Sequence, residues 1–461
     1  MKDDYEKFLK SISETLKSST IHGIPPILNS KNLIIRLVWI VSFFGSSCAC
    51  FWFILSNLNE YFKHEVVSKI KINYVNELPF PIISICNINP INTEELNQYM
   101  IGKFNGDKYP NMSLIDYAIT YQKMNQSIKF SRKALNETII KCLFKFNDCN
   151  LDEEFEYYFD EVYGNCFRFN SGKNMKGENV KQKVSYGVGI YNALELELYI
   201  GSIDQNENLF STEHGLNLFI TNETHDSLNG EGINISPGNS YKIIINKYSI
   251  IKESYPYSEC ISDLTTIDSY KSDCYKKVFR SNLTKYHYTD CYYICYQKLV
   301  EINCQCRILL GDYEMNPSLR ICQKNDFVCA DREWLDLISN KSHLTDCDCP
   351  FECETFGYNY KISISQFPTK KYYNYLRNEN FIRKLNPNMT FEEMRKSLTR
   401  LKIFYDEMKE TIVSEEIKID SIGLVSNIGG VFGVFMGFSF LSLIGFVEIC
   451  VNAFLILCAR R

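Results

Sequence analysis

The chain of 461 residues is 45% apolar and 23% charged, with a net charge of −5. This apolar fraction suffices for a large folded core and excludes a disordered or collagen-like polymer. The lysines are scattered, so the basic footprint that nucleic-acid binding needs is missing. The 19 cysteines are unusual for a cytosolic chain, where thiols stay reduced, and they predict that most of the chain lies outside the cell.

The first apolar segment, residues 33–55, predicts a membrane span. It reads LIIRLVWIVSFFGSSCACFWFIL, and its only charge is Arg36. At 1.5 Å per residue it covers roughly 34 Å, which is enough to cross a bilayer. A signal peptide is the alternative, but residues 1–32 are too long and too polar for its n-region, and no A-x-A cleavage site follows.

The second apolar segment, residues 422–458, is too long for one straight membrane helix. As a straight helix it would measure roughly 55 Å, whereas the hydrocarbon core of a bilayer is about 30 Å thick. The segment must therefore tilt, break or line an internal passage. Its single charge is Glu448. The recurring glycines fit two interpretations, a close helix-packing face or a pore lining. They are Gly423, Gly429, Gly430, Gly433, Gly437 and Gly445.

The distribution of basic residues predicts that both termini are cytoplasmic. Lysines outnumber acids in the N-terminal segment, residues 1–32, and Arg460 and Arg461 close the short C-terminal segment, residues 459–461. Residues 56–421 are then extracellular. Eight N-x-S/T glycosylation sequons fall inside this range, in agreement with that orientation. They begin at Asn111, Asn125, Asn136, Asn222, Asn234, Asn282, Asn340 and Asn388.

The cysteines divide by position into two groups. Cys48, Cys50, Cys450 and Cys458 lie in the apolar spans, where packing or palmitoylation is expected. Fifteen lie between the spans, nine of them crowded from residue 291 to residue 353. A structural zinc cluster is the alternative for C-x-C pairs, but oxidising surroundings favour disulfides.

The segment between the spans has a mixed α+β pattern. Residues 193–200, 216–220 and 240–250 alternate as strands do, whereas residues 286–300 and 391–410 have helical spacing. No internal repeat or low-complexity linker divides the segment, which predicts one interlocked, disulfide-rich domain.

Several segments, taken in order, resemble the degenerin and epithelial sodium channel family, which includes acid-sensing and neuropeptide-gated channels; the chain is most like the invertebrate peptide-gated members. The resemblance covers nearly the whole chain, and the final segment, GLVSNIGGVFGVFMGFSFLS, contains a G-x-S element. The matching segments are His22-Gly23, FPIISICN at 80–87, YGNCFRFN at 163–170, GINISPG at 232–238, PYSEC at 256–260, C-x3-C-x8-C-x-C from Cys291, C-x-C-x3-C from Cys347, and residues 423–442.

The resemblance implies a disulfide pattern of seven bridges and one unpaired residue, Cys274. An odd extracellular cysteine is either a buried free thiol, which we favour, or an intermolecular link. The implied bridges are Cys86–Cys166, Cys142–Cys149, Cys260–Cys353, Cys291–Cys349, Cys295–Cys347, Cys304–Cys329 and Cys306–Cys322.

The resemblance also implies a plasma-membrane trimer with a cation pore. Its extracellular domain would have a central β-sheet palm, a β-ball, and a helical thumb, finger and knuckle. The selectivity element would be Gly437-Phe438-Ser439, where an interrupted helix exposes carbonyls to permeant Na⁺. Pore-lining positions would include Asn427, Gly430, Gly433 and Glu448. Amiloride-like blockers are expected, and no metal or cofactor is required.

Two departures from the family pattern affect the expected selectivity. Phe438 stands where a small residue is usual, and Gly445 stands where relatives commonly carry a glutamate. Glu448, one turn on, is the replacement expected to supply the negative ring of the inner mouth. The alternative is an interfacial, partly neutralised carboxylate.

Gating residues are also implied by the resemblance. His22 and Gly23 match a cytoplasmic gating motif, whose alternative is a flexible turn, and Tyr257 matches an aromatic that couples to the first span. His64 stands alone, because Val66 replaces the family histidine, and a single exposed histidine is a poor proton switch. Asp331, Glu333 and Asp336 are candidates for an acidic ligand cleft, although such acids are often only solvated. We therefore favour an extracellular neuropeptide over protons as the opening ligand.

Other protein classes fit the sequence less well. A tethered hydrolase lacks support, since neither G-x-S-x-G in a strand–turn–helix setting nor H-E-x-x-H is present. A non-conducting adhesion or receptor glycoprotein would not need the long, glycine-rich second span. ATP-gated trimeric channels lack the G-x-S element and this cysteine spacing. A proton-gated or constitutive channel of the same family remains the alternative within the class, and homotrimers and heterotrimers are both open.

Overall fold

The computed structural model describes most of the chain in two compact units. The described residues are 17, 23–88, 135, 138–160, 164–201, 213–222, 232–280, 286–308, 318–320, 322, 324–339, 347–437, 439, 442, 444, 447 and 451. The first unit comprises residues 1–68, 256–258 and 415–461, and the second comprises residues 69–255 and 259–414.

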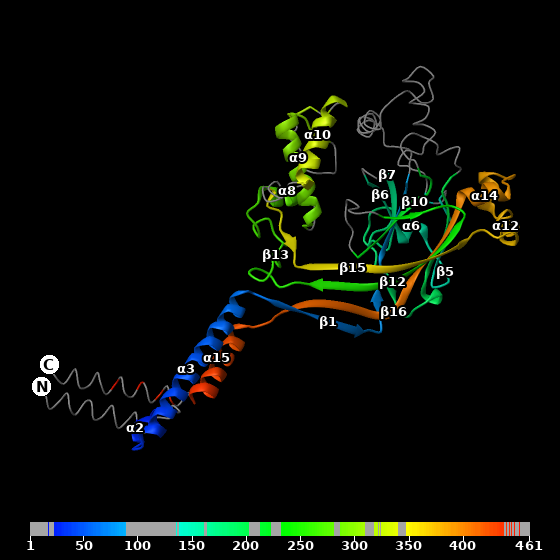
Figure 1. Cartoon of the computed structure of the whole chain (residues 1–461). Helices are drawn as coiled ribbons and strands as arrows, with labels where there is room; N and C mark the ends of the chain where they lie inside the picture. The colour runs from blue at the N-terminus through cyan, green and yellow to red at the C-terminus, as the bar shows by residue number, and fades with distance from the viewer. Residues whose placement is uncertain are drawn as a thin grey trace. The chain divides into compact units, whose positions relative to one another are not determined.

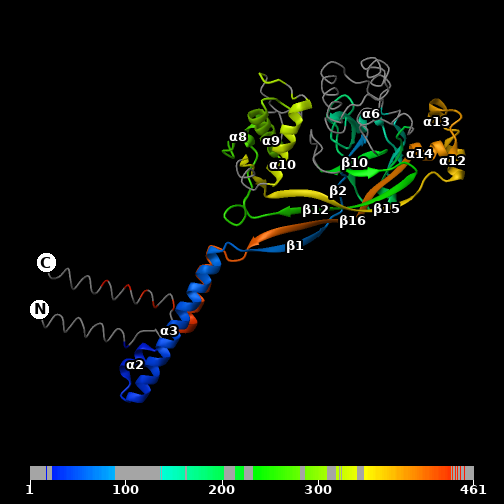
Figure 2. The same cartoon turned by 45° about the horizontal axis from the view of Figure 1, so that its top comes forward.

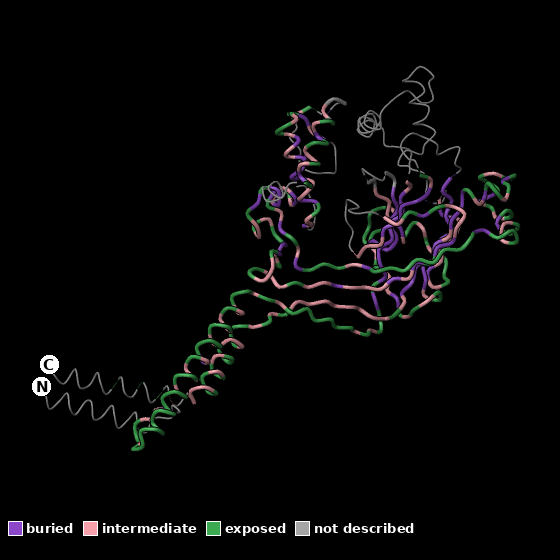
Figure 3. Tube along the Cα trace, viewed as in Figure 1, coloured by how far each residue is buried: buried purple, intermediate pink, exposed green. Residues whose placement is uncertain are grey.

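The first unit contains two apolar helices that lie side by side, α3 (Leu33–Phe62) and α15 (Ser421–Met436) (Figure 1). Asn32 caps α3 by accepting a hydrogen bond from the amide of Ile34. Most residues of α3 are exposed (Figure 3), and many of them are large apolar residues, which suits a lipid surrounding. Among the described residues, α3 is the helix long and apolar enough to cross a membrane.

The second unit is built on two main sheets, and the long strands β12 and β15 of the larger sheet pair antiparallel (Figure 2). The larger sheet has the order β15 (Glu354–Gln366), β12 (Asn239–Ile251), β16 (Leu398–Ile417), β9 (Leu194–Tyr199), β4 (Ile139–Phe144) and β5 (Asn147–Asp148), with β1 (Val66–Tyr74) paired to β16. The other has the order β11 (Ile233–Ile235), β10 (Leu216–Thr221), β3 (Ile82–Asn87), β7 (Gly164–Phe169) and β6 (Phe155–Asp160).

Short elements complete the second unit. Two small sheets pair β13 (Cys260–Ile261) with β14 (Phe351–Glu352), and β2 (Leu78–Pro79) with β8 (Val184–Ser185). The helices are α6 (Leu151–Glu154), α8 (Asp273–Arg280), α9 (Tyr288–Cys304), α10 (Lys324–Ser339), α12 (Lys370–Leu376), α13 (Asn380–Leu385), α14 (Phe391–Ser397) and the 3-10 turn η2 (Ile190–Asn192). In the first unit, α2 (Ile24–Asn29) precedes α3.

The main core follows from alternation along the strands. Leu194, Leu196 and Leu198 of β9 are completely buried, and Ile243 and Ile245 of β12 join them. Side chains two residues apart share one face of a strand, so this alternation places every second residue in the core. The strands predicted at 193–200, 216–220 and 240–250 are confirmed as β9, β10 and β12.

A second core holds the cysteine-rich helices α8, α9 and α10 together. Tyr275 and Tyr286 are fully buried in it, with ring centroids 4.8 Å apart. Helix α9 confirms the helix predicted from residue 286 to residue 300.

The predicted helix at 391–410 is wrong beyond its first two turns. Helix α14 begins with a capping box between Thr390 and Glu393 and ends at Ser397, where β16 starts. Strand β16 pairs with β12 on one side and with β9 on the other, burying Leu401 and Ile403. Pairing on both sides therefore overrides the local helical spacing.

Candidate functional site

The second apolar segment is interrupted at Gly437. Helix α15 ends there because Gly437 adopts φ 64° and ψ 23°, the left-handed region. Glycine enters this region without a Cβ penalty, which makes it the usual residue after a helix end. The Gly437 amide donates to the Gly433 carbonyl at 3.0 Å, which closes the last turn.

Ser439 and Ser442, which follow the interruption, form a reciprocal pair of hydrogen bonds. The Ser442 amide donates to Ser439 Oγ at 3.3 Å, and the Ser439 amide donates to Ser442 Oγ at 3.1 Å. This reciprocal pair has the geometry of a capping box at a helix start. The G-x-S element thus ends one helix and caps the next segment, and carbonyls at a helix end are free to face a ligand. Phe438, Gly445 and Glu448 lie outside the described residues.

Helix α15 packs on α3 through a limited set of side chains. Phe435 stacks on Phe53 with ring centroids 5.5 Å apart, and Ser47 Oγ donates to Met436 Sδ at 3.7 Å. Cys50, one turn from Ser47, is the one buried described residue of α3. The contacts fix which face of α15 is turned to α3.

The residues predicted to line a pore lie on one stripe of α15. Asn427, Gly430 and Gly433 are spaced three residues apart, and all three are exposed in the single chain. The stripe is therefore available for contact with water, lipid or another chain.

Gly23 occupies a position that excludes a side chain. It precedes α2 with φ 99°, and a Cβ built there would lie 2.8 Å from Phe43 Cδ2 on α3. Both the backbone conformation and the space require glycine. Its predicted partner in the motif, His22, lies outside the described residues.

His64 and Tyr257 meet at the end of the first helix. Their rings are edge to face with centroids 5.3 Å apart, and the centroid of the Tyr61 ring lies 6.3 Å from that of His64. His64 Nδ1 is buried and has no hydrogen-bond partner in the described chain. The expectation of an exposed histidine was wrong, because the chain turns here through a left-handed residue, φ 52°, which directs the imidazole onto Tyr257.

Next to His64, an ion pair joins the segments that follow α3 and precede α15. Lys418 Nζ donates to Glu65 Oε2 at 2.7 Å, and the Lys418 amide donates to the Glu65 carbonyl at 3.0 Å. The hydrogen bond from Lys418 lowers the pKa of Glu65, and the same bond raises the pKa of Lys418. The two residues are 353 positions apart, so no local pattern could have indicated the pair.

The candidate cleft acids all lie on α10. Asp331 is exposed, whereas Glu333 accepts a hydrogen bond from Asn303 Nδ2 at 2.8 Å and Asp336 is half-buried. Burial, together with the charges of Asp331 and Glu333, raises the pKa of Tyr296 on α9 to about 12. Within the described residues, no group of His, Cys, Asp and Glu is arranged to hold a metal ion.

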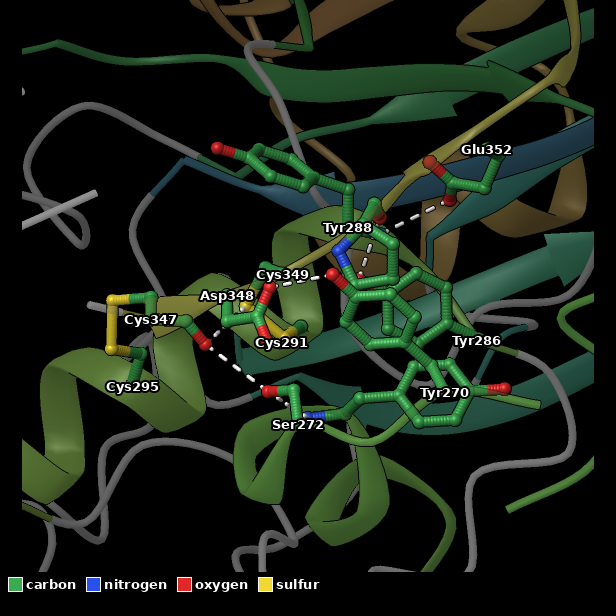
Figure 4. Close-up of a disulfide and its surroundings, with 12 residues drawn as sticks. Tyr270, Ser272, Tyr286, Tyr288, Cys291, Cys295, Cys347, Asp348, Cys349 and Glu352 are labelled. Carbon is green, nitrogen blue, oxygen red and sulfur yellow. Dashed lines mark hydrogen bonds between the residues drawn. A yellow bond between two sulfur atoms is a disulfide. The ribbon is translucent and has the colours of Figure 1, made fainter. Parts of the chain in front are cut away.

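The structure contains all seven implied disulfides. Figure 4 shows the surroundings of Cys295–Cys347 and Cys291–Cys349, where Ser272 Oγ donates to the Cys347 carbonyl at 3.2 Å. Tyr270 donates to Asp348 Oδ1 at 2.5 Å, and this bond raises the pKa of Tyr270 to about 12. Cys274 is a buried free thiol, and burial raises its pKa.

The sequence did not predict a buried network around Glu197 of β9. Glu197 is completely buried, and it accepts hydrogen bonds from Arg400 and, at 2.8 Å, from the Tyr372 hydroxyl. The Arg400 guanidinium also lies over the rings of Phe367 and Tyr372. The alternation of β9 indicated that Glu197 faces away from the leucines, but nothing local indicated its partner.

Of the predicted glycosylation sites, three lie in described residues. Asn234 and Asn388 are exposed, and Asn222 is half-buried. Asn111, Asn125, Asn136, Asn282 and Asn340 lie outside the described residues.

Comparison with known proteins gives a match over nearly the whole chain. A family model described as "Amiloride-sensitive sodium channel" matches residues 15–449. Bile acid-sensitive ion channels of Rattus norvegicus and Homo sapiens are each 25% identical, covering 95% and 96% of this chain and 86% of the relative. Acid-sensing ion channel 1 of Gallus gallus is 24% identical, covering 94% of this chain and 82% of its own. A solved proton-activated chloride channel gives a TM-score of 0.34 at 7% identity over 92% of this chain and 97% of its own, too low to support an argument.

Proposed function

Because the chain belongs to the amiloride-sensitive sodium channel family, whose members are ion channels and not enzymes, we propose that it is one subunit of a trimeric, ligand-gated cation channel. The observation that carries the proposal is the helix break between Gly437 and Ser439. A packing helix gains nothing from such a break, whereas a pore needs backbone carbonyls that can replace water around a cation.

In this proposal the ion path follows the second span. Asn427, Gly430 and Gly433 line it above the break, and Gly437, Phe438 and Ser439 form the narrow element. The exposed stripe on α15 supports this assignment, because three copies of it can face one axis without burying a bulky side chain. Glu448 supplies the negative ring at the inner mouth. Permeant Na⁺ is the transported ion, and the channel is sodium-selective or non-selective.

The proposed topology places both termini in the cytoplasm of a plasma-membrane protein. Two transmembrane segments, 33–55 and 422–458, flank an extracellular domain whose larger sheet is the palm. Helices α8 to α10 form the thumb and α12 to α14 the knuckle. The seven disulfides support an oxidising, extracellular location for this domain.

An extracellular ligand is proposed to open the channel, and a neuropeptide is the first candidate. The acids of α10 support a cationic ligand, since Asp331 is exposed and forms no ion pair within the described part of the chain. The names of the relatives support two other candidates, a bile acid and protons. The second would act through a group such as His64, which contacts Tyr257.

Whole-cell recording tests the proposal directly. Cells expressing the chain, alone and with related subunits, are superfused with amidated peptides, with bile acids and at acidic pH, with and without amiloride. A ligand-evoked inward current that disappears when external Na⁺ is replaced by a large impermeant cation supports a sodium channel. Surface expression without any current under all these conditions would instead favour a non-conducting receptor glycoprotein. Large currents on acidification, with none from peptides, would reject peptide gating.

A further inference from the structure

An open surface pocket of about 480 Å³ lies at α12 and α13 of the second unit, and exposed residues line it. Its lining consists of Asn374, Arg377, Asn378, Arg383 and Pro387. The volume is large enough for a small organic molecule, but the pocket is open to solvent on one side. Every polar side chain of the lining is a hydrogen-bond donor, and none is a carboxylate.

The segment that forms the pocket is strongly basic, although the chain as a whole has a net charge of −5. Residues 370–384 contain five basic side chains and one acidic side chain, Glu379, which gives a local charge of +4. Glu379 accepts a hydrogen bond from Tyr375, which raises the pKa of that tyrosine. The positive charge is therefore only slightly offset within the segment.

The two lining arginines lack carboxylate partners of the kind that Arg320 and Arg400 have. Arg320 pairs with Asp326, and Arg400 pairs with Glu197. Among the described residues, no carboxylate lies within 4.0 Å of Arg377 or Arg383. Two guanidinium groups that share a pocket without a counter-ion favour a bidentate oxyanion.

The walls of the pocket are held in place by the surrounding structure. Asn378 Nδ2 donates to the Asn374 carbonyl at 3.1 Å, and Arg383 Nη2 donates to Asn378 Oδ1 at 3.5 Å. Leu376 and Ile382, from the same two helices, are buried in a shared core. The buried neighbours thus anchor the backbone from which the exposed arginines project.

We propose that this pocket binds a small organic anion through a carboxylate, sulfonate or phosphate group. The anionic group would lie between Arg377 and Arg383, and the two asparagines would orient it. The pocket is much larger than an inorganic oxyanion, so the rest of the volume would be occupied by the organic body, against Pro387 and the arginine stems. The site is independent of the proposed channel activity, because binding is measured without current.

Calorimetric titration of the full chain in lipid nanodiscs tests the site, with 2-naphthalenesulfonate as the probe. The variant R377Q/R383Q should bind the probe at least about tenfold more weakly than wild type, since each charge-assisted hydrogen bond contributes strongly. The control K370Q/K371Q removes the same charge from the first turn of α12 but changes no lining residue, and it should bind as wild type does. Gel filtration confirms that both variants fold.

Three outcomes would overturn the proposal. Equal weakening in both double variants would show a general effect of charge, and no weakening in R377Q/R383Q would show that the probe binds elsewhere. Inorganic sulfate that binds as tightly as the probe and displaces it completely would show an adventitious ion only. Binding of the uncharged analogue 2-naphthalenemethanol with the same affinity would show that the arginines are not used.

Discussion

Replacing Gly437 with alanine should remove the break in the second span. At φ 64° and ψ 23°, an added Cβ costs about 1–2 kcal/mol. In a continuous helix, alanine is favoured over glycine by about 1 kcal/mol. The two effects act in the same direction, so G437A shifts the balance toward a continuous helix by about 2–3 kcal/mol per chain. That is a change of about 30- to 150-fold in the ratio of the two conformations.

The assay is the reversal potential with Na⁺ outside and K⁺ inside, together with surface biotinylation. G437A should lower the permeability of Na⁺ relative to K⁺, or abolish the current, while the protein still reaches the surface. The matched control is G429A, because Gly429 lies inside α15 and a Cβ there meets nothing within 4 Å. Wild-type permeability and current in G437A, or an equal change in G429A, would refute the assignment of the break as the selectivity element.

The remaining predictions concern ion pairs and the free thiol. The lowered pKa of Glu65 means that its pairing with Lys418 persists above the ordinary carboxyl pKa and is lost only as pH falls through the lowered value. E65Q should therefore change current amplitude but not the shape of the pH response between about pH 7.4 and 5.5; a response abolished by E65Q would contradict this. R400M leaves the buried Glu197 with the Tyr372 hydroxyl but without the guanidinium, which should cost about 3–5 kcal/mol and lower the thermal unfolding midpoint, with R400M/E197L recovering most of the loss. An unchanged midpoint in R400M would refute that role. Cys274 is 3% exposed, so maleimide should label it only after denaturation, and C274S should migrate as wild type on non-reducing gels. Rapid labelling of the native wild type that is absent in C274S would show an accessible thiol at Cys274 and contradict this.

Several strands and the disulfide pairs could be predicted from the sequence, because strand alternation is a local pattern and the cysteine spacing matches a family pattern. The alternation around Leu196 shows in six consecutive residues, and the spacing of Cys291, Cys295, Cys304 and Cys306 matched a known family pattern. The boundary between helix α14 and strand β16 could not be predicted from the sequence. The residues that pair with Leu401 on its two neighbouring strands lie about 160 to 200 positions away along the chain. Long-range pairing decides the conformation at such positions.

The candidate site was predictable only in part. The interruption at Gly437 was expected, but its closure by Ser442 was not, although S-x-x-S is a recognisable helix-start pattern. The surroundings of His64 could not be predicted, since Tyr257 lies 193 positions away and the turn that directs the imidazole has no sequence signature. Side chains that meet across such distances are set by the fold as a whole.

The helix break at Gly437 is held by weaker interactions than the disulfide-bonded second unit, so its conformation is the easier of the two to change. The disulfide-bonded second unit has covalent links, of which Cys260–Cys353 closes a loop of 93 residues, and such links restrict alternative conformations. The break at Gly437 is held by one left-handed glycine and by capping bonds of Ser439 and Ser442, each contributing only about 0.5–2 kcal/mol. A ligand with a differential affinity of about 3 kcal/mol for two states could therefore rearrange the break, whereas it could not rearrange the disulfide framework. In the proposed channel, opening by a ligand would thus require no unfolding of the cysteine-rich unit, only a change in a junction whose stabilising interactions are individually weak.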